Sequence, residues 1–143
     1  MEAQSYPGPI AVTFAYFLLW YYLLLVRQRG TKYRLQREYL AKGMEFDRYF
    51  GQDEEMLAAD RAVINTQEQM VPFLTAVWLN AIFVSTLVAT WLGAIYVVLR
   101  SLYPLLLGRK LSKIQSKRVY LVTLPCYSIV FYLIGSTVWS AFN

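Results

Sequence analysis

The sequence predicts an all-α integral membrane protein, in which residues 1–143 form one domain with four transmembrane helices. Of the 143 residues, 57% are hydrophobic and 17% are aromatic, which is more than a soluble domain usually carries. Ile10–Val26 and Val119–Phe142 contain no charged residue, and Met70–Leu107 contains only Arg100. Because a transmembrane helix needs about 20 apolar residues, these segments are predicted to span a bilayer.

The segment Met70–Leu107 is predicted to form two helices. A single helix of this length would extend about 57 Å, nearly twice the thickness of the hydrocarbon core, which is roughly 30 Å. The expected bundle therefore has helices at about 9–28, 60–84, 88–109 and 115–141, with a first loop at about 29–59.

The basic residues predict the orientation of these helices. Eight Lys and Arg residues lie from Arg27 to Arg61, and five lie from Arg109 to Arg118. Basic loops stay on the cytoplasmic side, so both clusters are predicted to be cytoplasmic and both termini to lie on the far side. This placement accounts for the net charge of +5 and argues against nucleic-acid binding, since the clusters adjoin the membrane segments.

The first loop contains apolar residues among its charges. Leu35, Leu40 and Met44 predict a short amphipathic helix near the lipid headgroups, with Gly43 and Gly51 as breaks.

Histidine is absent from the sequence and cysteine occurs once, as Cys126. The lack of histidine argues against a haem or zinc site and against histidine-based acid–base catalysis. Cys126 lies in the last apolar segment, where we expect a buried packing residue rather than a reactive thiol.

Three polar residues at helical spacing precede an apolar tract. Arg61, Asn65 and Glu68 are separated by steps of four and three, so they share one stripe of a helix. Pro72 lacks an N–H group and leaves the carbonyl of Glu68 without its helical partner. These features predict a binding site at the cytoplasmic membrane boundary.

Arg100 and Tyr103 lie on one face of the third helix. A charge inside a span costs a few kcal/mol, so Arg100 is expected to meet a partner or a wet cavity. Glu68 is the candidate partner across the bundle.

Other interpretations of these charges remain open. Arg27, at the end of the first helix, can extend to the interface as a long side chain often does. Arg61 and Glu68 can form a structural ion pair, and Lys117 and Arg118 can serve as orientation signals.

The candidate residues favour a small zwitterion that has more carboxylates than amines. The guanidinium group of arginine can donate two parallel hydrogen bonds to a carboxylate, and the single carboxylate of Glu68 suits an ammonium group. Glutathione has two carboxylates, one ammonium group and a thiol, and fits this description.

These motifs resemble those of the MAPEG family, the membrane-associated proteins in eicosanoid and glutathione metabolism. Arg61-x-x-x-Asn65-x-x-Glu68, followed by Pro72-Phe73-Leu74, is similar to the family's helix-two signature. The resemblance covers nearly the whole chain and extends to three further features: Arg27 at the end of helix one, Arg100-x-x-Tyr103 in helix three, and Leu124-Pro125-Cys126 in helix four.

The resemblance implies a homotrimer that binds glutathione between neighbouring subunits and takes an apolar co-substrate from the bilayer. A eukaryotic member would lie in the endoplasmic reticulum, although other membranes remain open. The implied glutathione contacts are Arg27, Arg61, Asn65, Glu68, Arg100 and Tyr103.

The sequence departs from the pattern of catalytic members at two positions. Gln115, followed by Ser116, stands where they place a thiolate-stabilising arginine, and Leu107 stands where a second tyrosine is often found. A thiol with a pKa of about 8.5 is mostly protonated at neutral pH, and an amide stabilises its thiolate less than a cation does. We therefore expect either transfer of glutathione to lipophilic electrophiles or reduction of lipid hydroperoxides, or alternatively a non-catalytic lipid-binding accessory protein or structural subunit.

Overall fold

The computed structural model describes residues 5–111 and 117–143, and all the regular secondary structure within them is helical. The predicted all-α class is therefore confirmed. The helices are α1 (Pro7–Tyr22), the π-helix η1 (Leu23–Gln28), α2 (Arg29–Ala41), α3 (Glu54–Phe83), α4 (Thr86–Leu107) and α6 (Tyr120–Phe142).

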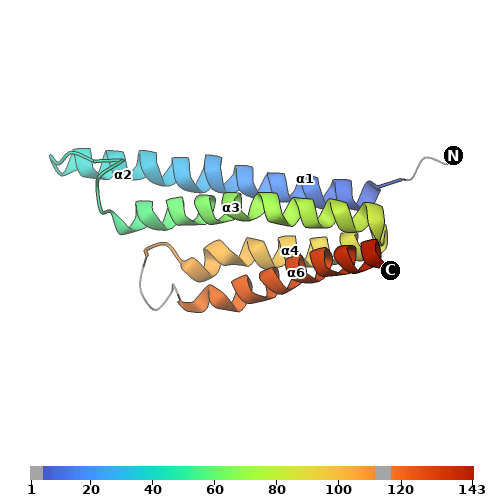
Figure 1. Ribbon diagram of the computed structural model, residues 1–143. Coiled ribbons are helices and arrows are strands. Elements are labelled where there is room, and N and C mark those ends of the chain that lie inside the picture. Colours follow the sequence, from blue (N-terminus) through green and yellow to red (C-terminus); the bar gives the residue numbers. More distant parts are fainter. Residues whose placement is uncertain (1–4, 112–116) are drawn as a thin grey trace.

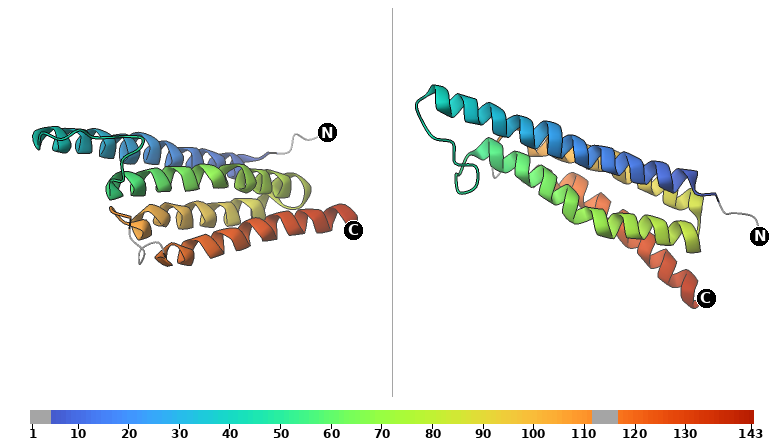
Figure 2. Two further views of the ribbon diagram at one scale, coloured as in Figure 1. Left: turned by 60° about the vertical axis from the view of Figure 1, so that its left-hand side comes forward. Right: turned by 90° about the horizontal axis from the view of Figure 1, so that it is seen from above.

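The long helices lie side by side in an antiparallel bundle, with the start of α1 and the end of α6 at the same end (Figure 1). We call this the apolar end; it holds the start of α1, the α3–α4 turn and the end of α6. The opposite end, which we call the basic end, holds α2, the start of α3 and the end of α4. Figure 2 shows the same arrangement from two further directions.

Three helices are long and apolar enough to cross a membrane, namely Pro7–Ala41, Thr86–Leu107 and Tyr120–Phe142 among the described residues. The helix α3 carries more charge and does not meet this composition, yet it packs against α1, α4 and α6. Its antiparallel position in the bundle fits the second of the four predicted transmembrane helices, at about 60–84.

Residues 29–41, which we expected in the first loop, instead prolong the first helix without a break. The α1–η1–α2 helix ends before Gly43, which has φ +68° and so adopts a conformation that glycine tolerates readily. Leu35 is buried against Met56 and Ala59, whereas Leu40 and Met44 are exposed. The predicted amphipathic segment is thus an extension of the first helix rather than a separate element.

The helix α3 begins at Glu54 rather than near residue 60. Asp53 caps it by accepting hydrogen bonds from the backbone N–H groups of Glu55 and Met56, both at 3.0 Å. Glu54 and Glu55 lie in the first turn, where negative charge favours the helix dipole. Capping residues outside the apolar tract therefore set this boundary.

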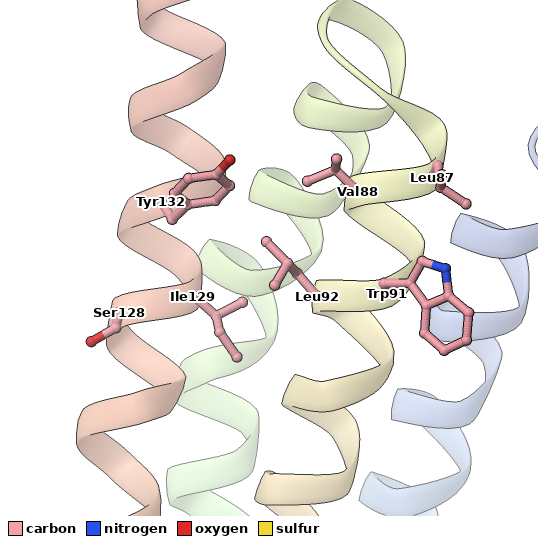
Figure 3. Close-up of a pocket in the computed structure, with 7 residues that line it drawn as sticks. All are labelled: Leu87, Val88, Trp91, Leu92, Ser128, Ile129 and Tyr132. Carbon is pink, nitrogen blue, oxygen red and sulfur yellow. The ribbon is translucent and has the colours of Figure 1, made fainter.

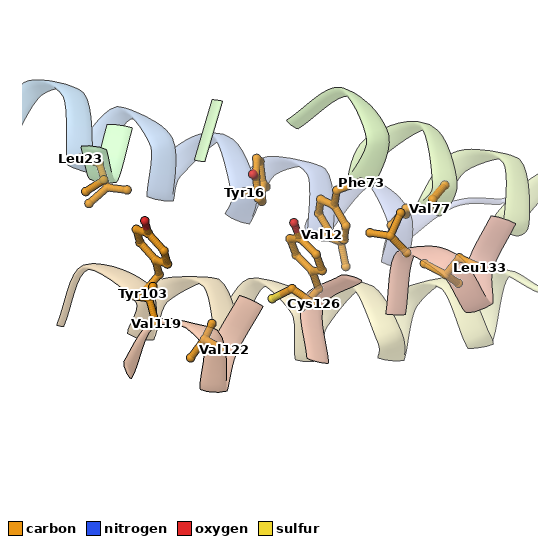
Figure 4. Close-up of a cluster of buried hydrophobic side chains, with 14 of the residues drawn as sticks. Val12, Tyr16, Leu23, Phe73, Val77, Tyr103, Val119, Val122, Cys126 and Leu133 are labelled. Carbon is orange, nitrogen blue, oxygen red and sulfur yellow. The ribbon is translucent and has the colours of Figure 1, made fainter. Parts of the chain in front are cut away.

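Aromatic side chains fill the middle of the bundle, where all four long helices meet (Figure 4). Phe73 stacks on Tyr96 with a centroid distance of 3.8 Å, and its centroid lies 5.0 Å from that of Tyr16. The Tyr16 hydroxyl donates a 2.6 Å hydrogen bond to the Thr66 carbonyl. Cys126 is buried in the same core, as predicted.

The helices α1 and α4 approach closely at glycine. A Cβ atom on Gly93 would lie 2.8 Å from Cγ1 of Val12, whereas one on Gly135 in α6 would meet nothing within 4 Å. Small residues permit such close helix packing inside membranes.

Candidate functional site

Arg100 lies inside the bundle with Asn65 and Tyr103. It is only 1% exposed, and its Nη2 donates a hydrogen bond to Oδ1 of Asn65. Its guanidinium carbon lies 4.5 Å from the centroid of the Tyr103 ring, a cation–π geometry. The expected partner was Glu68, so the structure corrects that prediction to Asn65.

No carboxylate of the described residues neutralises Arg100. Its Nε has no hydrogen-bond acceptor, and the buried hydroxyl of Tyr96, one turn earlier, also has no partner among the described residues. A buried cation is costly unless it is paired and hydrogen-bonded. An amide oxygen and an aromatic face therefore compensate Arg100 only in part.

Arg61 and Glu68 lie on the exposed side of α3. Neither forms a hydrogen bond or ion pair within residues 5–111 and 117–143, so the structural ion pair considered above is not present there. Ile64 and Val71 are exposed on the same helix, at 51% and 73%. We call these four residues the outer face of α3; it combines two unpaired charges with apolar side chains.

Arg27 connects the first helix to the end of α4. Its Nη1 donates to the Pro104 carbonyl at 2.8 Å, and its Nη2 donates to the Gly108 carbonyl at 2.5 Å. The residue lies in η1, and π-helical segments often occur at functional sites because they re-aim side chains. Sequence spacing did not reveal the π-helix, which breaks the ordinary helical period.

A polar groove of about 470 Å³ opens beside Arg27 at the basic end. Glu55 lies within it and accepts hydrogen bonds from Arg34 and from Nε of Arg109, the latter at 3.0 Å. Burial acts to raise the pKa of Glu55, but the hydrogen bonds from the two arginines outweigh it and hold that pKa below its ordinary value. We call this the basic groove. Sequence analysis missed it, since its members are distant in the chain and carry no motif.

A second groove, of about 490 Å³, lies between α4 and α6 toward the apolar end. Figure 3 shows Ile129 and Tyr132 of α6 reaching toward Val88 and Leu92 of α4. None of its lining residues is charged, so it can hold an apolar group but not an ionic one. We call it the apolar groove.

The remaining predicted positions lie at or beyond the end of α4. Leu107 is buried as the last residue of that helix, and Gln115 and Ser116 lie outside the described residues. Within the described part of the chain, no group of three or more His, Cys, Asp or Glu residues could hold a metal ion.

The fold and the placement of charge define a class: a multi-pass helical membrane protein with its ionic groups concentrated at one end of the bundle. More specifically, the chain belongs to the MAPEG family, whose family model matches residues 6–139. Membership broadly supports a membrane function related to glutathione or eicosanoids. A comparison with curated proteins finds no match.

Proposed function

We propose that this protein binds glutathione within the membrane and transfers it to lipophilic electrophiles or uses it to reduce lipid hydroperoxides. The observation that carries this proposal is the outer face of α3, where Arg61 and Glu68 have no partner within the described chain. Membership of the MAPEG family makes glutathione the preferred ligand for these charges.

The outer face of α3 needs a covering partner. Unpaired charges facing lipid are unfavourable, and here they alternate with the exposed apolar side chains of Ile64 and Val71. A second copy of the chain can cover the apolar residues while a charged ligand between the copies meets Arg61 and Glu68. The proposed assembly is the homotrimer that the resemblance to the MAPEG family implies.

The spacing of the two charges suits a tripeptide. Arg61 and Glu68 are seven residues apart on a helix, which corresponds to a rise of about 10 Å. Three extended residues also span about 10 Å. Glutathione can therefore place a carboxylate at Arg61 and its ammonium group at Glu68.

The remaining candidate contacts already have partners inside the chain. Asn65 accepts from Arg100, Arg100 lies over Tyr103, and Arg27 donates to two carbonyls of the α4 end. In the proposed site these side chains bind the ligand either in place of their present intrachain partners or in addition to them. Arg100 would contribute positive charge, which favours a thiolate.

The reaction would use the glutathione thiolate as a nucleophile. In conjugation its sulfur forms a bond to the electrophilic carbon, and the displaced group leaves with its electron pair. In peroxide reduction the sulfur attacks the terminal peroxide oxygen and becomes a sulfenic acid, while the alkoxide leaves and takes up a proton as the alcohol. The thiol of a second glutathione then displaces water from the sulfenic acid and forms the disulfide. Proximity and charge stabilisation would supply most of the acceleration.

The alternative function is that of a non-catalytic lipid-binding accessory protein or structural subunit. Leu107 stands where catalytic members of the family often have a second tyrosine, and Arg27 already donates hydrogen bonds to two backbone carbonyls. The apolar groove between α4 and α6 would hold the lipid in this case.

A glutathione titration of the purified protein tests the proposed site. We expect glutathione to raise the melting temperature of the wild type, and Arg61→Ala and Glu68→Ala to abolish that rise while native mass spectrometry still reports a trimer. Arg37→Ala is the matched control, since Arg37 is an exposed cation whose Nε donates a hydrogen bond to the Tyr33 carbonyl of its own helix. If the wild type does not respond, glutathione is not the ligand.

Turnover separates the two functions. The wild type is given glutathione with a chromogenic aryl halide or with cumene hydroperoxide. Turnover above the protein-free rate supports the enzyme, whereas intact binding without turnover favours the accessory protein. Localisation of the tagged protein would test the proposed endoplasmic-reticulum membrane in a eukaryotic cell.

A further inference from the structure

The basic groove gathers cations from three parts of the chain. Arg27 comes from η1, Arg34 comes from α2, and Arg109 follows the end of α4. Arg109 is 70% exposed, and of its guanidinium nitrogens only Nε has a partner in the described residues, namely Glu55. Its two terminal nitrogens are therefore available to a ligand.

The charges of the groove do not cancel. Glu55 bridges Arg34 and Arg109, and Glu38 on α2 pairs with Arg34 at 2.7 Å. Three guanidinium groups thus face two carboxylates, which leaves one positive charge. A phosphodiester carries one negative charge and matches this balance, and guanidinium forks are well suited to its oxygens.

The rim of the groove is apolar on the side nearest the membrane segments. Tyr22, at the end of α1, and Leu105, in the last turn of α4, both line the groove and are exposed, at 57% and 73%. A free phosphate would gain nothing from them. A phospholipid would place its headgroup at the cations and its acyl chains along these side chains and the apolar helices beyond.

We propose that the basic groove between α2, α3 and the end of α4 binds the phosphodiester headgroup of an anionic phospholipid. Basic pockets between transmembrane helices bind lipid headgroups in this way. Arg34 and Arg109 make the headgroup contacts, and Arg27 adds charge while its terminal nitrogens hold the α4 carbonyls. The groove shares Arg27 with the candidate glutathione contacts, but the headgroup contacts proposed here, Arg34 and Arg109, are not among them, so variants at these two positions test the lipid site separately.

Lipid binding is measured by native mass spectrometry on the full chain released from detergent. The protein is titrated with phosphatidylglycerol and, separately, with phosphatidylcholine of the same acyl chains. We expect phosphatidylglycerol to bind more tightly, and Arg109→Gln to weaken it about fivefold, with a further loss of similar size for the Arg34→Gln, Arg109→Gln double variant. The control is Arg37→Gln. It removes one positive charge from α2, the helix that carries Arg34, but outside the groove, and it should leave binding unchanged.

Three outcomes would overturn the proposal: equal affinity for the two lipids, equal losses in Arg37→Gln and Arg109→Gln, or thermal stabilisation by inorganic phosphate that matches that by phosphatidylglycerol. The double variant removes both partners of Glu55 and can unfold, so its melting curve is recorded first. Arg109→Gln alone keeps the test decisive, since this exposed side chain contributes little to folding.

Discussion

The two ends of the bundle are stabilised by different interactions. At the apolar end the buried polar groups are neutral: Asn80 donates to the Leu133 carbonyl at 3.1 Å and to Oγ of Ser136 at 2.8 Å. At the basic end, buried or half-buried cations such as Arg100 and Arg27 rely on amide and carbonyl oxygens. Neutral hydrogen bonds therefore suffice at one end, whereas the other end keeps cations that no carboxylate of the described residues neutralises.

The largest loss of stability is expected from removing the aromatic core in the middle of the bundle, which lies between the two ends. Phe73 is fully buried and stacks on Tyr96, so Phe73→Ala should lower the free energy of unfolding by about 3–5 kcal/mol. Phe131 is 75% exposed on α6 and provides the matched control. Unfolding by SDS, followed by circular dichroism, measures both variants; equal losses would show that packing of the aromatic core does not stabilise the fold.

The next effect should come from the partner of the buried cation at the basic end. Asn65→Leu leaves Nη2 of Arg100 without an acceptor and should cost about 1.5–3 kcal/mol of unfolding free energy. Asn65→Asp keeps an oxygen in place and adds a negative charge, so its loss should be smaller. The same unfolding assay applies. Wild-type stability in Asn65→Leu would mean that Arg100 is compensated by other groups.

A smaller effect is expected at Gly93, where α1 and α4 pack closely. Gly93→Ala places a methyl group against Val12 and should cost about 1–2 kcal/mol, at the lower end of overpacking costs. Gly135→Ala adds the same methyl group in open space, where better helix propensity should make it neutral or slightly stabilising. If both variants behave alike in the unfolding assay, the close approach of α1 and α4 does not contribute to stability.

The sequence predicted the helices because apolar length and helical period are local properties. It predicted the wrong partner for Arg100, and the helical angle explains why. Around α3, Asn65 lies about 100° from the buried Thr66, whereas Glu68 lies about 160° from it and turns away from the core. Both Asn65 and Glu68 belong to the same polar stripe of α3. Their spacing in the sequence therefore could not show which of them faces Arg100.

The features that the sequence did not predict depend on contacts between distant segments. Arg27 reaches carbonyls of Pro104 and Gly108, and Glu55 meets Arg109 from another helix. Carbonyl acceptors have no residue signature, since every residue carries one. The ligand site on α3 stays a prediction, because its partner would come from outside the single chain.

The smallest expected effect is a pH dependence confined to the basic end. Because Arg34 and Arg109 hold the pKa of Glu55 below its ordinary value, the ion pairs stabilise the fold when Glu55 is charged. This contribution is fully present above the ordinary glutamate pKa of about 4.3, and it is lost as the pH falls through the lower pKa of the folded state. The expected loss is about 1 kcal/mol or less, since Arg109 is mostly exposed.

Glu54 provides the matched control for this effect. Glu54 and Glu55 share the first turn of α3 and interact equally with the helix dipole, but Glu54 forms no ion pair within the described residues. Unfolding free energies of the wild type, Glu55→Gln and Glu54→Gln are compared from pH 7 downward. The advantage of the wild type over Glu55→Gln should shrink on acidification, whereas the Glu54→Gln curve should stay parallel to the wild type. Parallel curves for all three proteins would show that the arginines do not stabilise the charged form of Glu55, and the charge balance of the basic groove would then have to be revised.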